Sequence, residues 1–519
     1  MPPAPPNTHR SEKSHIAGNV FAVCAVLLVA AICVMNFLSG AKVLPNALNS
    51  DMLLMPSVLE DLLRQGGMQS DWYLSPSPYW FPDYLMFLVG FGLVNGAYLQ
   101  LAIFTATQIL VFSATVYGLM RALDVRSAAL ATGLTVSLFA WLALPAVEPF
   151  SILLVPETHF GAFMASLLVL TLVLRVRRFA VTAGAALIIA AIVVLTVFSD
   201  DMFTGHTALV MLMLFLMLGA SSFSDQRRDA FKMAGLFLIS GLLGTAAYLL
   251  IIVNPVRYGY ELSLSDAPSR ITELATMFAR SAATHPLPTL IAPVMTCVGL
   301  WVLAKLLWSR SGWPFDGFIM ALAFMGLSGA ITVALALGNA NVPLADRYFL
   351  TVLAVPLVLA VAGAARLSSR QLDPILGVAT AGFVAISGWQ VGLQIQLNGL
   401  HIDYYPNQIA CIDRALVAHD AKLGVAHYWE SRPITTFNRS GAVVAPVQRN
   451  LKANRWHVSK RSFHDAYDFA VVRTDSPPYE TLSSADVRKT SGAAIAETDC
   501  GNVRVLVYAK GGIRVPPQP

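Results

Sequence analysis

Several acidic, histidine and arginine side chains of this chain lie in short segments that connect long apolar stretches. Those with candidate roles are Asp51 in NSD, Glu157 and His159 in PETHFG, Asp200 and Asp201 in SDD, and Asp346 and Arg347 in DRYF, with Arg257 in a further segment. Carboxylates and imidazoles transfer protons, and a guanidinium group pairs with anionic oxygens. This distribution indicates a chemical site at one surface of a membrane rather than a path through it.

The composition identifies the setting of these residues. Of the 519 residues, 56% are hydrophobic and only 13% are charged, whereas soluble domains carry about 25% charged residues. The chain is therefore expected to be an integral membrane protein. No nucleic-acid partner is expected for it.

Eleven apolar runs are long enough to cross a bilayer about 30 Å thick as helices. They cover residues 17–38, 96–120, 128–146, 158–174, 179–198, 206–222, 233–253, 287–308, 316–337, 348–365 and 374–393. The shorter run 83–94 is expected to form a re-entrant or interfacial helix. The predicted fold class is an all-α polytopic membrane bundle with a small C-terminal α/β domain.

Arginine and lysine residues predict the orientation of the bundle, because they are enriched in cytoplasmic connections. Every connection from an even to an odd span is basic, and so is the leader; these segments hold Arg10, Lys13, Arg121, Arg126, Arg175, Arg177, Arg178, Arg227, Arg228, Lys232, Lys305, Arg310, Arg366 and Arg370. The N-terminus is therefore expected inside and the C-terminus outside. The expected parts are a disordered cytoplasmic tail 1–16, a transmembrane domain 17–394 with a long first outer loop 39–95, and an extracytoplasmic domain 395–519.

The outer domain is predicted to have an α/β fold. Short β-like runs such as DFAVV and VRVLVYA alternate there with helical segments. Cys411 and Cys500 lie in this domain, and two cysteines in an oxidising compartment predict a disulfide.

The spans themselves are nearly free of ionisable side chains. Ion-coupled transporters place such groups near the bilayer midplane, so a flippase or transporter is disfavoured. Single acidic residues also have structural interpretations. Asp83 follows Pro82 and is expected to cap a helix, and Asp200 or Asp201 is a candidate cap of the sixth span.

The architecture, together with NSD (49–51), PYWFPD (78–83), PETHFG (156–161), SDD (199–201) and DRYF (346–349), resembles the GT-C glycosyltransferases. The relatives meant are the protein O-mannosyltransferases and the bacterial lipid A aminoarabinose transferases. The resemblance covers the whole chain as architecture. It implies transfer of a sugar from a polyprenyl-phosphate donor to a lipid, glycan or protein acceptor, at the outer face of a bacterial inner membrane.

One departure narrows what the resemblance implies. The O-mannosyltransferases carry adjacent Asp-Glu at the first-loop position, where this chain has Asp51 between Ser50 and Met52. Transfer of mannose to protein is therefore not implied.

The resemblance also implies roles for the candidate residues. Asp51 matches the acid of the first outer loop and is expected to be the general base for the acceptor, with Asp200 or Asp201 as the next candidate. Arg347 and Arg257 are expected to bind the donor phosphate; the alternative for Arg347 is a helix-end pair with Asp346. Glu157 and His159 are the candidate ligands of a divalent metal ion.

A helix is predicted directly after Asp51. The spacing of its apolar residues is typical of an amphipathic helix lying on the membrane surface; they are Leu53, Leu54, Val58, Leu59, Leu62 and Leu63. The structural alternative is that Asp51 or Ser50 serves only as the N-cap of this helix.

Two other classes of function stay open: a lipid-linked glycan polymerase or ligase, and a membrane scaffold. Convergence of Asp51, Glu157, Asp200 and Arg347 at one site would favour a transferase. Scatter of these residues would favour a scaffold.

Overall fold

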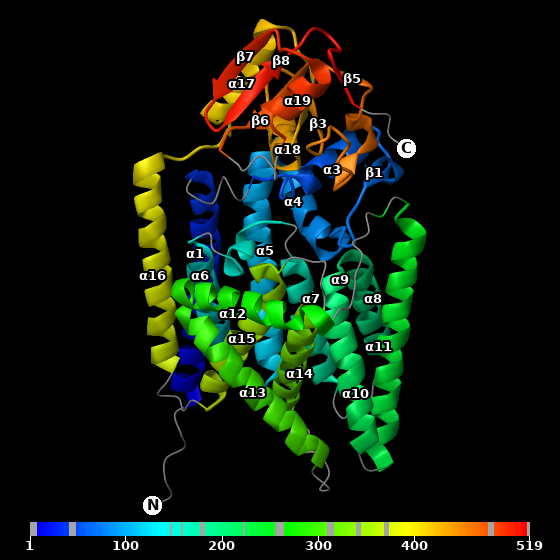
Figure 1. The fold of residues 1–519 in the computed structure, drawn as a ribbon. Helices are drawn as coiled ribbons and strands as arrows, with labels where there is room; N and C mark the ends of the chain where they lie inside the picture. Colours follow the sequence, from blue (N-terminus) through cyan, green and yellow to red (C-terminus); the bar gives the residue numbers. More distant parts are fainter. Residues whose placement is uncertain are drawn as a thin grey trace, which may run out of the picture.

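The fold is given by a computed structural model, which describes residues 8–40, 48–145, 148–156, 159–176, 182–221, 224–253, 255, 264–308, 316–338, 344–367, 373–475 and 482–515. A helical bundle forms most of it (Figure 1), and the strands of a smaller domain gather at one end of that bundle.

Each of the eleven predicted spans overlaps a helical segment. The segments are α1 (Thr8–Leu38), α5 (Ala97–Ala122), α6 (Ala128–Ala143), α7 (Phe160–Arg175), α8 (Ala183–Ser199), α9 (Asp201–Phe203) continuing through η5 (Thr204–Ala208) into α10 (Leu209–Ser221), α11 (Ser224–Ile251), α13 (Pro286–Trp308), α14 (Gly317–Gly338), α15 (Leu350–Leu367) and α16 (Asp373–Asn398). Eight of them are long and apolar enough to cross a membrane. The chain is thus a multi-pass membrane protein. The apolar helices α6, α7 and α8 have 16, 16 and 17 residues, so the total of eleven crossings stays a prediction.

The two ends of the bundle differ. Helix α1 begins at the end far from the strands, and the C-terminal domain covers the other end (Figure 1). This relative placement agrees with the predicted topology, in which the N-terminus and the C-terminal domain lie on opposite sides. One helix, α12 (Ala267–Thr284), lies across the bundle rather than along it. This helix is amphipathic.

The connection between α1 and α5 folds into several short elements. They are α3 (Leu54–Arg64), η1 (Gln69–Asp71), β1 (Trp72–Tyr73), η2 (Trp80–Tyr84) and α4 (Leu85–Leu93). Helix α3 confirms the predicted amphipathic helix, and it lies between the bundle and the C-terminal domain (Figure 1). Helix α4 has nine residues, which is too short to cross a bilayer, as expected for this run.

Two capping interpretations are wrong. Helix α3 begins after Leu53, and no side chain caps it. The backbone amides of Asp51 and Met52 both donate to Oδ1 of Asn49, at 3.0 Å. Asp51 and Ser50 therefore do not cap this helix. Asp83 does not cap α4 either, because it lies inside η2 and makes no capping bond.

The C-terminal domain is built on a five-stranded sheet in the order β3-β2-β6-β8-β7. Its strands are β2 (Leu423–Ala426), β3 (Val443–Pro446), β6 (Phe469–Arg473), β7 (Ala496–Cys500) and β8 (Val503–Val507), and its helices are α17 (Asn407–Ala418), α18 (Tyr428–Phe437) and α19 (Ser484–Ser491). Strands β3, β2 and β6 are parallel, and β8 and β7 continue antiparallel. The short elements β4 (Val458–Ser459), η8 (Lys460–Ser462), β5 (Ala466–Tyr467) and β9 (Ile513–Arg514) lie outside this sheet, and η3 (Phe150–Leu154), η6 (Leu264–Asp266) and η7 (Asp346–Phe349) lie in the bundle connections. A disulfide joins Cys411 of α17 to Cys500 of β7.

Both faces of the sheet are packed against other parts of the protein. Successive residues of a strand point to opposite faces, so one strand contributes to the packing on both. In β6, Phe469 and Val471 belong to an apolar cluster that continues into the bundle, whereas Ala470 and Val472 belong to a separate cluster. The domain therefore shares a core with the membrane part.

Polar contacts add to this attachment. Strand β1 pairs with β4 across the domain boundary, and Arg461 lies 3.3 Å from the Asp61 carboxylate and 3.2 Å from that of Asp71. The indole of Trp72 donates to Asp61 at 2.7 Å. Asp61 and Asp71 of the first outer loop thus both pair with Arg461 of the C-terminal domain.

Candidate functional site

Three of the predicted residues form one buried cluster at the beginnings of α7 and α9. Nδ1 of His159 lies 2.9 Å from both carboxylate oxygens of Asp200. The Ser77 hydroxyl lies 2.6 Å from Oδ1 of Asp201 and 3.2 Å from Oδ1 of Asp200. These side chains come from segments far apart in the sequence, so the cluster exists only in the folded chain.

Asp200 has a structural role in this cluster. It is the N-cap of α9 and accepts from the Met202 amide at 3.0 Å, which confirms the capping interpretation for this residue. Its side chain is only 2% exposed and also accepts from His159. A carboxylate with these partners orients the imidazole, and a substrate has little access to it. Asp201, which is half-buried, is the more accessible of the two.

The backbone at the cluster has an unusual conformation. Tyr79 (φ 60°) and His159 (φ 65°) both lie in the left-handed region, which bulky residues rarely adopt. Their rings are 5.5 Å apart. Such conformations persist where the surrounding structure holds them, and they concentrate at functional sites.

Asp83 lies against the same cluster and is almost completely buried, at 2% exposed. Burial, with the nearby Asp200 carboxylate acting in the same direction, raises the pKa of its carboxyl to about 8. A Cβ at Gly161 would lie 1.9 Å from Oδ2 of Asp83. The glycine of PETHFG is therefore what allows this carboxyl group to approach the N-terminus of α7.

Asp51 lies under the C-terminal domain. It accepts a hydrogen bond from the phenolic hydroxyl of Tyr428, and the two residues flank further contacts: Ser50 donates to the carbonyl of Tyr428, and Arg432 donates to the carbonyl of Ser50. Tyr428 and Arg432 lie one turn apart on α18, so both face the Asn49–Asp51 turn. The domain thus orients the carboxylate that follows α1.

A row of rings connects the regions around Asp51 and Asp200. Ring centroids are 5.7 Å apart for Tyr348 and His159, 5.5 Å for His159 and Tyr79, and 6.5 Å for Tyr79 and His457. Burial holds the pKa of His457 well below its usual value, and the positive charge of Arg432 acts in the same direction. His457 is therefore a neutral imidazole at physiological pH.

Arg347 is a partly exposed cation near His159. Its Nη1 lies 3.7 Å from Oε1 of Glu148, and the side chains are 31% and 38% exposed. Asp51 is close enough to interact with it electrostatically, and His159 and Arg347 line the same small cavity. The partner of Arg347 is thus Glu148, and the alternative of a helix-end pair with Asp346 is not what the structure records.

The folded chain therefore brings His159, Asp200, Asp201 and Arg347 together, and Asp51 lies within electrostatic range of Arg347. Glu157 and Arg257 lie outside the described residues, and their predicted roles stay predictions. Sequence reasoning missed Ser77, Tyr79, Tyr428, Arg432 and His457. Three of these belong to the C-terminal domain, and no local pattern indicates that α18 packs over the end of α1.

The predicted metal site stays a prediction as well. Among the residues that the structure describes, no group of three or more His, Cys, Asp or Glu side chains is arranged to hold a metal ion. Nδ1 of His159 is bonded to Asp200. The described donor set therefore does not by itself form a metal site.

No protein-family model matches this chain. No curated protein matches it either. Among solved structures, it is similar to the crystal structure of the Archaeoglobus fulgidus oligosaccharyltransferase in complex with Zn and sulfate, with 13% sequence identity and a TM-score of 0.42. That match covers 87% of this chain and 67% of the archaeal one.

Proposed function

We propose that this protein is a membrane glycosyltransferase of the GT-C type. It would move a sugar from a polyprenyl-phosphate donor to a lipid, glycan or protein acceptor, at the membrane face that the C-terminal domain covers. The observation that carries the proposal is the hydrogen bond by which Tyr428 of the C-terminal domain orients the Asp51 carboxylate. Arg347 lies within electrostatic range of that carboxylate. A scaffold would not need an oriented carboxylate within range of an accessible guanidinium.

The proposed reaction uses these two groups in different ways. The Asp51 carboxylate takes the proton from the acceptor hydroxyl or amine as that group attacks the anomeric carbon. The bond from the acceptor to this carbon forms while its bond to the phosphate oxygen breaks, so the configuration is inverted. Arg347 pairs with the phosphate, whose negative charge increases as it leaves.

The remaining residues would position these two. Tyr428 and Arg432 hold the turn that carries Asp51. His159 is hydrogen-bonded to Asp200 and lies against the rings of Tyr79 and Tyr348, and it lines the small cavity that Arg347 also lines. No step is assigned to a metal ion.

The test is mass spectrometry of membrane lipids and envelope glycans from cells that make the protein and from a matched deletion strain. We expect the deletion to accumulate one polyprenyl-phosphate sugar and to lose one glycosylated product. Wild-type protein and Glu60→Gln should restore the product, because Glu60 is an exposed carboxylate on neighbouring α3. Asp51→Asn should not restore it. Identical lipid and glycan profiles with and without the protein would contradict the proposal.

A further inference from the structure

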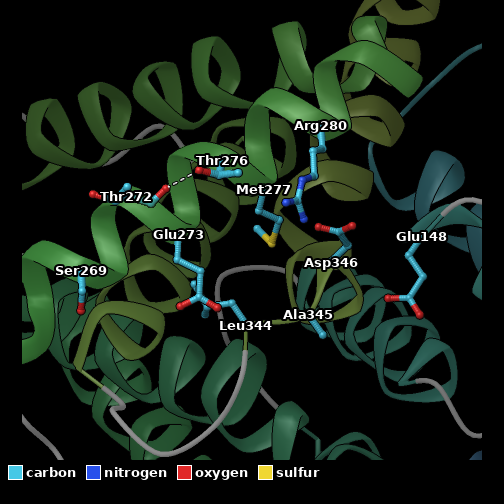
Figure 2. A pocket seen from close by; sticks show the side chains of 10 residues that line it. All are labelled: Glu148, Ser269, Thr272, Glu273, Thr276, Met277, Arg280, Leu344, Ala345 and Asp346. Atoms are coloured by element: carbon cyan, nitrogen blue, oxygen red, sulfur yellow. Dashed lines mark hydrogen bonds between the residues drawn. The ribbon is translucent and has the colours of Figure 1, made fainter. Parts of the chain in front are cut away.

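A second recess lies beside the site, between α12 and the segment that leads into α15. It has a volume of about 540 Å³, which is within the range of roughly 300–1,000 Å³ common for small-molecule pockets. Figure 2 shows the side chains that line it: Glu148, Ser269, Thr272, Glu273, Thr276, Met277, Arg280, Leu344, Ala345 and Asp346. None of them has a role in the reaction proposed above.

One face of α12 is built for this pocket. Its lining residues are spaced at three, four, seven, eight and eleven positions after Ser269, the spacing that places side chains on one side of a helix. This side is polar apart from Met277. The neighbouring Phe278 instead packs against Phe349, with ring centroids 5.8 Å apart. A polar helix face is thus directed into the pocket and an aromatic side chain into the bundle.

Two hydroxyl groups of the pocket present hydrogen-bond acceptors. Thr276 donates its hydroxyl proton to the carbonyl of Thr272 at 2.8 Å, and Ser269 donates to the carbonyl of Asp266 at 2.7 Å. Their oxygens therefore face the pocket as acceptors.

The charges have the same bias. Three carboxylates, those of Glu148, Glu273 and Asp346, line the pocket with the single guanidinium of Arg280. Glu273 also pairs with Arg270 at 3.0 Å, on the next turn of α12. Glu148 pairs with Arg347, and Arg280 acts electrostatically on Asp346. The carboxylate oxygens are thus partly neutralised, and they favour an uncharged ligand with several O–H or N–H donors.

The pocket is continuous with the proposed phosphate-binding residue. Glu148 lines the pocket and is also the ion-pair partner of Arg347. Asp346 lines it too and directly precedes Arg347 in the chain. A phosphate on Arg347 would thus have this pocket beside it.

We infer that this pocket binds a sugar ring, uncharged or amine-bearing, of a substrate whose reacting group lies at Arg347. The inference rests on the proposed function for the role of the sugar in transfer, but sugar binding itself does not depend on it. The shared hydroxyl chemistry of donor and acceptor sugars fits the pocket in either case. Three carboxylates against one guanidinium in the lining disfavour an anionic sugar such as a uronic acid.

Binding is measured without any transfer reaction, by saturation-transfer difference NMR on the purified full-length protein in nanodiscs. The probes are glucose, glucosamine and glucuronate. We expect signals from glucose and glucosamine and none from glucuronate. Thr276→Trp, which fills the pocket from an exposed helix position, should abolish the signals. Ala275→Trp is the matched control, because Ala275 is exposed on α12 but does not line the pocket, and it should bind as wild type does.

Several results would overturn the inference: no binding of the neutral sugars to wild-type protein, equal binding of glucuronate, or unchanged binding by Thr276→Trp. Its failure is distinct from that of the proposed function. If the protein binds sugar but transfers none, the inference about the pocket holds and the proposed transferase function is wrong. Where transfer occurs, Thr276→Trp should raise the KM for the donor if the donor sugar occupies the pocket, or that for the acceptor if the acceptor does, by about tenfold or more. An unchanged KM for both would overturn the inference.

Discussion

Tyr428 donates a hydrogen bond to the carboxylate of Asp51, which lies 377 residues earlier in the chain. The phenol belongs to the extramembrane domain, and the carboxylate belongs to the turn after the first membrane helix. This contact makes the C-terminal domain part of the candidate site, and it gives Asp51 an environment that its neighbours in sequence do not supply.

The first prediction concerns Asp51→Asn. Asparagine keeps the size of the side chain and can still bond to Tyr428, but it cannot take a proton. We expect normal expression and unfolding temperature with a loss of transfer rate of roughly 10²–10⁴-fold, measured with the labelled donor at saturation. Glu60→Gln on α3 is the control and should retain its rate. An active Asp51→Asn protein would exclude Asp51 as the base and leave Asp201 as the next candidate.

Tyr428→Phe tests the contact between the domains. Removing one hydroxyl leaves the ring packing intact, so the protein should fold, but Asp51 loses the group that orients it. We expect a rate loss smaller than that of Asp51→Asn. Tyr405→Phe is a matched control, since Tyr405 also donates to a carboxylate, that of Asp413 at 2.7 Å, within the same domain. Equal rates for the two phenylalanine variants would argue against a positioning role for Tyr428.

Arg347→Lys should weaken donor binding. Lysine keeps the charge but loses the planar two-pronged contact with a phosphate. One charge-assisted hydrogen bond contributes about 1.5–3 kcal/mol, so the donor KM should rise by roughly tenfold or more, with a smaller change of kcat. Arg366→Lys at the other end of α15 removes a two-pronged contact with Asp316, 2.8 Å at each oxygen, and should leave the donor KM unchanged. A wild-type KM for Arg347→Lys would remove Arg347 from phosphate binding.

Gly161→Ala should destabilise the site region by about 1–3 kcal/mol, the usual cost of overpacking. The new methyl group would overlap the Asp83 carboxylate. Combining it with Asp83→Ala should recover much of the loss, because the clash is then relieved. Gly92→Ala is the control, since nothing lies within 4 Å of a Cβ at that position. Unfolding temperatures in detergent measure all four proteins, and additive effects of the two site substitutions would contradict this account.

The stability of the C-terminal domain should depend on Asp468. Burial acts to raise the pKa of this carboxyl, but hydrogen bonds from the backbone amides of Gly511, Lys422 and Leu423 outweigh it and hold the pKa below its usual value. A lowered pKa stabilises the fold above the unfolded-state value of about 3.9, and this contribution is lost as the pH falls through the folded-state value. Asp468→Asn should therefore lower the unfolding temperature near pH 7, and the difference from wild type should shrink on acidification below about pH 4. Asp465→Asn, at an exposed carboxylate of the same domain, is the control and should leave the unfolding temperature near pH 7 unchanged.

Much of the membrane part could be predicted from the sequence, and for a direct reason. A bilayer requires each crossing segment to be apolar and to satisfy its own backbone hydrogen bonds, so a local pattern is sufficient to locate a helix. A local pattern is also sufficient for several other elements. These are the short helix α4, the amphipathic helices α3 and α12, and strands β6 and β8. The capping assignments of Asp51 and Asp83 were wrong, because side chains far away in sequence, and Asn49 nearby, compete for the same groups.

Three features thus follow from the sequence alone. They are the set of apolar helices, the small α/β domain after them, and the acidic, histidine and arginine residues at the ends of those helices. The contacts at the site are visible only in the tertiary structure. His159 and Ser77 both bond to Asp200, and Glu148 rather than Asp346 pairs with Arg347. Helix α18 of the C-terminal domain covers Asp51. Helix formation depends on residues three and four positions apart. The site depends on how whole helices and a distant domain pack against one another, which no local spacing records.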